Sequence, residues 1–210
     1  MMNLEGRHAH WEQVYIEKGE KEVSWFEASP TPSLELIEAA QATPASAIVD
    51  IGGGASRLVD ALVDQGFQNV TVLDISERAL VAAKNRLGER ARAVHWVMSD
   101  VTTWSPDEAA FDIWHDRAAF HFLTDENDRA AYVARMVRAI KPLGHAIIAT
   151  FALDGPERCS GLPVVRYDGR TLREAIGHEF ELLATRPQAH RTPRGLVQNF
   201  QFSLFRLRAK

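Results

Sequence analysis

The stretch from residue 47 to residue 63 constrains the fold more than any other part of this chain. Ala47–Ile51 is a short, apolar, β-branched run, which is typical of a strand buried on both faces. Three consecutive glycines follow, and glycine alone adopts positive φ freely and lets a ligand or another backbone approach closely. Apolar residues then recur at helical spacing from Leu58 to Val63. A strand, a glycine turn and a helix in this order predict the ligand-binding corner of a doubly wound α/β sheet.

The residues of this turn discriminate between nucleotide ligands. A dinucleotide fingerprint, G-x-G-x-x-G, would need a third glycine where Arg57 stands, and no lysine is present for a P-loop. The stretch from Asp50 to Ser56 instead reads D-x-G-x-G-x-S. It resembles motif I of the class I S-adenosylmethionine-dependent methyltransferases, commonly D/E-x-G-x-G-x-G, with Ser56 in place of the last glycine. An acidic residue at this strand end suits a cofactor that carries an ammonium and a sulfonium.

A second and a third acidic residue support the same cofactor. Asp74 ends a predicted strand over Asn69–Leu73, at the spacing where Rossmann-like sheets place a carboxylate on the ribose hydroxyls. It could instead be a capping or surface residue, but acids at successive strand ends favour the cofactor. Ile75 is suited to lie against adenine. A third strand, Ala93 to Met98, leads to Asp100, and the resemblance implies that a carboxylate here meets the adenine amino group.

The remaining pattern extends the resemblance over nearly the whole chain. Lys141-Pro142-Leu143-Gly144 is similar to the L-K-P-G-G turn of the family, with Leu143 in place of its first glycine. Further strands are predicted over 111–114, 145–151, 180–185 and 200–207, and helices over 33–41, 76–87, 125–140 and 170–176, with another helix starting after a turn at 104–107. The last two strands match the antiparallel pair that ends the class I sheet. The predicted fold class is therefore α/β, a doubly wound, mostly parallel seven-stranded sheet with helices on both faces and an antiparallel last strand.

Length and composition fit one domain without an obvious membrane or nucleic-acid partner. The 210 residues are enough for a single well-buried core, with a net charge of −4 and one cysteine. We expect a single domain over 1–210: an arm and first helix over 1–44, a cofactor-binding core over 45–151, and substrate loops with the terminal strand pair over 152–210. No leader or membrane-spanning run is evident, so we expect a cytoplasmic protein that does not bind nucleic acid or membranes. The oligomeric state is not predicted.

An aromatic arm precedes the domain. Trp11 and Tyr15 lie at helical spacing, and Trp25 follows a charged turn. The arm either packs on the core or closes over cofactor and substrate to exclude water. The pattern is similar to the leader of small bacterial methyltransferases and of some protein-lysine methyltransferases. Together with the motifs above, it defines the cofactor candidates: Trp11, Tyr15, Trp25, Asp50, Gly52, Gly53, Gly54, Ser56, Arg57, Asp74, Ile75, Asp100, Val101 and His115.

His115-Asp116-Arg117 ends the predicted fourth strand, which in the resembling fold faces the transferred methyl group. His115 is the candidate catalytic base, although a histidine at a strand end is often only structural, and Asp116 is its neighbour or a cofactor contact. Nucleic-acid amino-methyltransferases generally carry Asn/Asp-Pro-Pro-Tyr/Phe here, so this sequence argues against such an acceptor. No histidine spacing indicates a metal site.

Two late stretches, 152–168 and 186–197, are longer than a connection needs and supply candidate acceptor contacts. Arginine pairs with carboxylates in bidentate fashion, although arginines on loops are usually only solvated. Cys159 could bind the acceptor or simply fill the core. The candidate substrate residues are Arg117, His121, Arg158, Cys159, Tyr167, His190 and Arg191.

Three classes of function follow. The first is S-adenosylmethionine-dependent methyl transfer to a small acceptor with an anionic or thiol group. The second is protein-lysine methylation, which the aromatic leader suggests. The third is a nucleotide-binding module without catalysis or an NAD-dependent oxidoreductase, which the missing third glycine and the lack of a Y-x-x-x-K pair disfavour.

Overall fold

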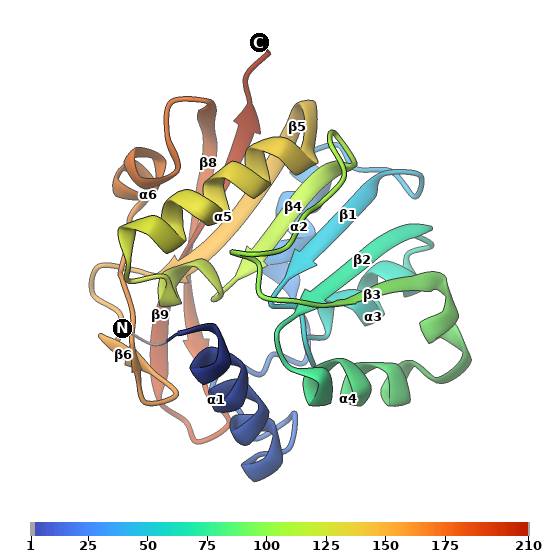
Figure 1. Cartoon of the computed structure of the whole chain (residues 1–210), viewed down its shortest axis with the longest axis vertical. Helices are drawn as coiled ribbons and strands as arrows, with labels where there is room; N and C mark the ends of the chain where they lie inside the picture. The colour runs from blue at the N-terminus through green and yellow to red at the C-terminus, as the bar shows by residue number, and fades with distance from the viewer. Residues whose placement is uncertain (1–2, 210) are drawn as a thin grey trace.

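A seven-stranded sheet forms the centre of the computed structural model, which describes residues 3–209. Its strand order is β3-β2-β1-β4-β5-β9-β8 (Figure 1). The first five strands are parallel, whereas β9 runs antiparallel to both of its neighbours, so the predicted fold class is confirmed. The strands are β1 Ala47–Ile51, β2 Asn69–Asp74, β3 Val94–Met98, β4 Phe111–Arg117, β5 Ile140–Phe151, β8 Phe180–Arg191 and β9 Val197–Leu207.

Helices cover both faces of this sheet. One buried cluster joins the sheet to the helices α2, α3 and α4, and a second joins it to α5 and α6. In Figure 1, α5 lies in front of the sheet and α2 and α3 lie behind it. The helices are α1 Leu4–Glu17, α2 Thr31–Ala39, α3 Leu58–Asp64, α4 Glu77–Leu87, α5 Glu126–Ala139 and α6 Gly169–Ile176, with 3-10 turns at Gly88–Ala93 and Phe120–Phe122.

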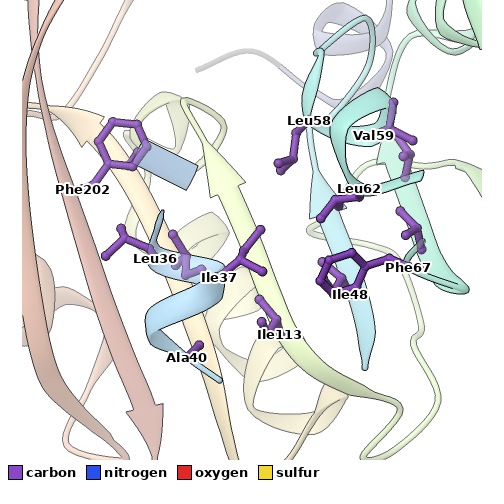
Figure 2. Packing of buried hydrophobic residues seen from close by; sticks show 14 of the residues in the cluster. Leu36, Ile37, Ala40, Ile48, Leu58, Val59, Leu62, Phe67, Ile113 and Phe202 are labelled. Carbon is purple, nitrogen blue, oxygen red and sulfur yellow. The ribbon is translucent and has the colours of Figure 1, made fainter. Parts of the chain in front are cut away.

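Alternation along the strands decides which side chains meet which helices. Ile48 of β1 and Ile113 of β4 point to the face covered by α2 and α3, where Leu36 and Leu62 meet them (Figure 2). The next residue along each strand, Val49 in β1 and Trp114 in β4, points to the opposite face and packs in the cluster with α5 and α6. From Ile113 onward, after a register shift next to Phe111, the odd-numbered residues of β4 share one face and the even-numbered residues share the opposite face.

Helix ends follow the local sequence signals. The Ser76 side chain accepts a hydrogen bond from the Ala79 N–H at the start of α4, and Asp125 accepts from the Asn127 N–H at the start of α5. Gly88 ends α4 with φ of +59°, a conformation that glycine adopts without strain.

The chain departs from the predicted elements at four places. β5 begins at Ile140, so residues 141–144, predicted as a turn, lie within the strand. Residues 99–110 form turns and irregular loop, so the helix predicted after 104–107 is absent. The stretch 186–197 is mostly strand, because β8 and β9 extend as a long hairpin closed by a short turn. The stretch 152–168 contains a small hairpin of β6 Arg158–Cys159 and β7 Leu162–Pro163. Period-two alternation in these polar hairpin arms is weak, which explains why the sequence reads as loop.

The N-terminal arm, residues 3–30, lies across the carboxyl ends of the parallel strands, with α1 below that edge of the sheet in Figure 1. Several polar contacts hold it there, three of which lie along α1 and the turn after it. Arg7 pairs with Asp100 at 3.0 Å, the Ser76 hydroxyl donates to Glu12 at 2.7 Å, and Glu20 pairs with Arg86 at 2.5 Å. The arm thus covers the edge where ligands of open α/β sheets bind.

Candidate functional site

A cavity lies between the arm and the carboxyl ends of β1, β2, β3 and β4. It holds about 820 Å³ of empty space when its open mouth and the solvent there are included. Its walls are mainly apolar and aromatic, with a few charged groups. The lining residues are Arg7, Trp11, Tyr15, Trp25, Ile51, Gly52, Leu73, Asp74, Ile75, Ser99, Asp100, Val101, Arg117, Ala118, Ala119, Phe122, Leu123 and Cys159.

The glycine turn is packed too closely to accept side chains. A Cβ on Gly53 would lie 2.5 Å from Oδ2 of Asp50, and a Cβ on Gly54 would lie 2.5 Å from Oδ2 of Asp74. Gly52 has φ of +64° and lines the cavity, whereas Gly53 and Gly54 are buried beneath it. The turn therefore lets a ligand reach the end of β1 while two carboxylates lie directly below it.

Asp74 places a buried carboxylate on the cavity wall. Its Oδ1 accepts a hydrogen bond from the Ser76 N–H at 2.8 Å. Burial raises the pKa of Asp74 to about 7, with Asp50 and Glu12 adding like-charge repulsion and the Ser76 N–H opposing the shift. This carboxylate is short of hydrogen-bond donors, which a pair of ribose hydroxyls would supply.

Asp100 also lines the cavity, but both of its oxygens are engaged. Oδ1 accepts from the Thr102 N–H and hydroxyl at 2.8 and 2.6 Å, and Oδ2 pairs with Nε of Arg7 at 3.0 Å. Arg7 also donates to Asp128 at 2.7 Å. The sequence analysis missed Arg7, whose only signal was its place in the arm.

Aromatic side chains of the arm form the wall opposite the sheet. Trp11 packs edge-on against Trp25 and Phe122, with ring centroids 5.8 and 4.9 Å away. Tyr15 packs edge-on against Trp25 at 6.4 Å, and burial raises the pKa of its hydroxyl. All three predicted arm residues thus line the cavity while packing against one another and against Phe122.

His115 does not line this cavity. Its Nδ1 lies 2.7 Å from Oδ1 of Asp50 and its Nε2 lies 2.8 Å from Oγ of Ser33, and the residue is 1% exposed. Both ring nitrogens are therefore occupied by protein partners. The structure gives no support to His115 as a general base toward a substrate in this cavity.

Asp116 points to the opposite face of the sheet from His115, as the alternation of β4 requires. It accepts hydrogen bonds from the Ala119 and Phe120 N–H groups and from the Tyr132 hydroxyl at 2.7 Å. Burial raises the pKa of Asp116 to about 6, although the three hydrogen-bond donors lower it in part. Its role in the structure is to hold the turn after β4, and it cannot act together with His115.

The turn that Asp116 holds brings two alanines, missed by the sequence analysis, to the cavity. Ala118 adopts φ of +69°, which is strained for a residue with a Cβ. The Cβ of Ala119 would lie 2.9 Å from a Cβ added at Gly52. Their small side chains line the cavity where the ends of β1 and β4 meet. The other lining residues outside the predicted set are Ile51, Leu73, Ser99, Phe122 and Leu123.

Arg117 is the only predicted substrate arginine that lines the cavity. Its Nη1 donates to the Trp25 carbonyl at 2.8 Å, and its Nε pairs with Glu27 at 3.2 Å. Its guanidinium lies over the Phe200 ring, 4.9 Å from the centroid. Nη2 has no hydrogen-bond partner in the part of the chain that the structure describes. Burial lowers the pKa of Arg117, which Glu27 opposes.

The other predicted substrate arginines turn away from the cavity. Arg158 and Arg191 are exposed, and each donates to a carbonyl of its own hairpin, Gly161 and Gly195 respectively. Each therefore closes its own turn, so the expected convergence of these arginines on the site is wrong.

Cys159 is the one further predicted substrate residue in the cavity wall. Burial raises the pKa of its thiol to about 11, so the thiol is protonated near neutral pH. His121 and Tyr167 are buried outside the lining, and burial with the nearby Arg117 lowers the pKa of His121 to about 3. His190 Nε2 donates a hydrogen bond to the Ser24 carbonyl oxygen at 2.7 Å, and this contact fastens the arm to β8.

Ser56 and Arg57 line a smaller second cavity behind Trp25, together with His115 and Arg117. Ser56 accepts a hydrogen bond from the Leu58 N–H, and Arg57 pairs with Glu20 of the arm at 2.6 Å. Arg86, another residue missed by the sequence analysis, donates to the Ser56 carbonyl at 2.7 Å and to Asp60. The glycine turn and the arm are thus tied to α3 and α4.

The cavity fits the cofactor that motif I implies. Ile75 and Val101 offer apolar walls for adenine, Asp74 offers acceptors for ribose hydroxyls, and Gly52 leaves the approach to the strand end open. Asp50 is not among the lining residues: it lies below the turn with a buried Oδ2 that has no partner in the described chain, and a cationic group bound at the turn would compensate its charge. These four features match adenine, ribose and a cationic amino-acid tail.

Residues 3–209 contain no cluster of three or more His, Cys, Asp or Glu side chains placed to hold a metal ion. No described helix is long and apolar enough to cross a membrane.

Comparisons with known proteins agree with this geometry. Residues 48–144 match the family model of a methyltransferase domain. The chain is 26% identical over 176 residues to an eEF1A lysine and N-terminal methyltransferase of Mus musculus, covering 82% of this chain but only 23% of that relative. It therefore spans less than a quarter of the length of this curated relative.

Two solved structures share the fold along nearly the whole chain. One, described as "Conversion of a Disulfide Bond into a Thioacetal Group during Echinomycin Biosynthesis", superposes with a TM-score of 0.77 at 18% identity, covering 96% of this chain and 93% of that one. The other, a 1,6-didemethyltoxoflavin-N1-methyltransferase of Burkholderia thailandensis with its substrate and S-adenosylhomocysteine bound, has a TM-score of 0.74 at 20% identity, covering 99% and 92%.

Proposed function

We propose that this chain is a class I S-adenosylmethionine-dependent methyltransferase, since residues 48–144 match the family model of a methyltransferase domain and the cavity fits that cofactor. We further propose that it methylates a small acceptor bearing a carboxylate or a thiolate. The observation that carries the proposal is Arg117, which lines this mainly apolar and aromatic cavity and whose Nη2 has no hydrogen-bond partner within residues 3–209. A guanidinium donor in such surroundings favours an anionic group.

The titratable groups around the cavity support an acceptor that is already ionised. Among the described lining residues no histidine is present, the Cys159 thiol is held protonated, Asp100 is paired with Arg7, and we assign Asp74 to the ribose hydroxyls. In methyl transfer, the nucleophile bonds to the methyl carbon while the carbon–sulfur bond breaks and its electron pair stays on sulfur. An anionic nucleophile and a sulfonium then become two neutral groups, and no proton has to be removed.

The chain itself contributes alignment and exclusion of water. The arm, held by Arg7, Glu12 and Glu20, covers the carboxyl edge of the sheet. Trp11 and Trp25 present rigid walls with few rotatable bonds, which limits the orientations of a bound acceptor. Cofactor and acceptor would meet beside the Ala118–Ala119 turn, which lines the cavity next to Gly52.

The test is transfer of a labelled methyl group from S-adenosylmethionine to fractionated cell extract. Label in the small-molecule fraction supports the proposal. On the identified acceptor, Arg117→Lys should raise KM about tenfold or more, because lysine lacks the forked donors of arginine, while S-adenosylhomocysteine affinity stays within about twofold. An unchanged KM would remove Arg117 from acceptor binding.

Protein-lysine methylation is the second candidate, since the matched Mus musculus relative is a lysine and N-terminal methyltransferase. A lysine acceptor would favour carboxylates next to the aromatic wall. Glu27 pairs with Arg117 and Asp100 pairs with Arg7, so these carboxylates are already neutralised. Label confined to the protein fraction would decide in favour of this candidate.

A further inference from the structure

Ser33, His115 and Asp50 form a buried hydrogen-bonded chain beneath the glycine turn. The two contacts are 2.7 Å (Asp50 Oδ1 to His115 Nδ1) and 2.8 Å (His115 Nε2 to Ser33 Oγ). The three residues are 2%, 1% and 1% exposed, in the order Asp50, His115, Ser33. Neutral histidine with its proton on Nδ1 satisfies both contacts: the ring donates to the carboxylate, and the serine hydroxyl donates to the ring.

The fold brings these residues together from three separate elements. Asp50 of β1 and His115 of β4 are paired in the parallel register, so their side chains lie next to each other on the same face. Helix α2 covers that face, and its first turn supplies Ser33. Ser33 is 1% exposed, and Ser33 and His115 line only the smaller second cavity, so these hydrogen-bonded residues are placed to orient a group and not to attack a substrate in the main cavity.

Asp50 is the member of this triad nearest the glycine turn, and one of its carboxylate oxygens has no hydrogen-bond partner in the described residues. Oδ1 of Asp50 accepts from His115, whereas Oδ2 is buried and has no partner within the described residues. The site of a Cβ on Gly53 is only 2.5 Å from Oδ2, so this oxygen lies directly against the turn. A buried carboxylate oxygen without a partner is unfavourable unless a bound group compensates it.

The geometry points to a positioning role: Ser33 holds His115, His115 fixes the rotamer of Asp50, and Asp50 is thereby held to compensate the ammonium of the cofactor. The inference rests on the proposed function only in taking the cofactor to be S-adenosylmethionine. His115 and Ser33 act through Asp50 and contact neither the cofactor nor the acceptor. Through this histidine, Ser33 in the first turn of α2 influences how tightly the cofactor binds.

The experiment compares two ligands by calorimetry. One is S-adenosylhomocysteine, and the other is its analogue with hydrogen in place of the amino group. His115→Ala should weaken S-adenosylhomocysteine binding about tenfold or more and leave the analogue within about twofold. His115→Asn keeps a donor near the Nδ1 position and should restore most of the affinity. Ser33→Ala should weaken S-adenosylhomocysteine by about threefold only.

His145→Ala is the matched control, since His145 is a half-buried histidine of β5 outside both cavities. It should change neither affinity. If His115→Ala or Ser33→Ala weakens both ligands equally, the histidine supports the turn without acting on the ammonium, and the inference is overturned. If the wild-type protein binds neither ligand, the proposed function fails instead.

Discussion

The raised pKa of Asp74 makes cofactor affinity depend on pH in a definite direction. In the free protein burial raises the pKa of this carboxyl to about 7, so near pH 6 most molecules hold Asp74 protonated. Ribose hydroxyls donate to the carboxylate and favour its ionised form. Binding therefore requires loss of a proton below pH 7, and affinity should rise as pH rises through that value.

The magnitude follows from linkage. If Asp74 is ionised in the complex, the dissociation constant of the ligand is proportional to 1 + [H⁺]/Ka, where Ka is the acid dissociation constant of Asp74 in the free protein. With a pKa of about 7, this factor is about 11 at pH 6 and about 1.1 at pH 8. S-adenosylhomocysteine should therefore bind about tenfold more tightly at pH 8 than at pH 6.

Calorimetry from pH 5.5 to 8 on the wild-type protein and on Asp74→Asn measures this effect. The variant cannot ionise at this position, so its profile reports every other titrating group, the ligand and the neighbouring Asp50 and Glu12 included. At pH 8 it should bind more weakly by about 1–3 kcal/mol, because it loses a charged acceptor. Wild-type and variant profiles of the same slope would refute the role of Asp74.

The stability of the free protein should show the opposite trend. Folding raises the Asp74 pKa above its unfolded value of 3.8, so the folded state holds this proton more tightly. The free energy of unfolding should consequently lose a contribution as pH rises from about 4 to about 7. Asp74→Asn should not show that loss in urea titrations.

Three further outcomes are expected. Arg158→Ala and Arg191→Ala, made at side chains that only close their own hairpins, should leave the KM of the acceptor unchanged, in contrast to Arg117→Lys, and a raised KM in steady-state kinetics would return them to the site. Glu20→Gln weakens the ion pairs to α3 and α4 and should speed hydrogen exchange over the arm, whereas cofactor binding should slow it; unchanged exchange in both experiments would leave the arm as packing only. Tyr132→Phe removes the hydroxyl that accepts a hydrogen bond from Trp114 and donates one to Asp116. It should lower the free energy of unfolding, measured in urea, by about 1–3 kcal/mol and leave cofactor affinity unchanged. An unchanged unfolding midpoint would show that these two hydrogen bonds do not stabilise the fold.

The cofactor corner was predictable because its signals are local. The β-branched run, the three glycines and the acidic residue at the next strand end follow from backbone conformation and from strand alternation within about 30 residues. Caps such as Ser76 and Asp125 satisfy helix ends two or three residues away. Wherever the cause of a structure lies within a few turns of chain, the sequence alone determined it, and the parallel sheet followed from repeating such units.

Pairings between distant segments were decided only by the tertiary structure. His115 and Asp116 are adjacent in sequence but face opposite sides of the sheet, and the partners of His115 come from residues 33 and 50. Arg7 joins Asp100 across the cavity edge, and Arg117 meets Glu27 of the arm. Residue type could not separate Arg117 from Arg158 or Arg191, because an arginine binds a ligand or its own hairpin according to which carbonyls and carboxylates the fold brings near it.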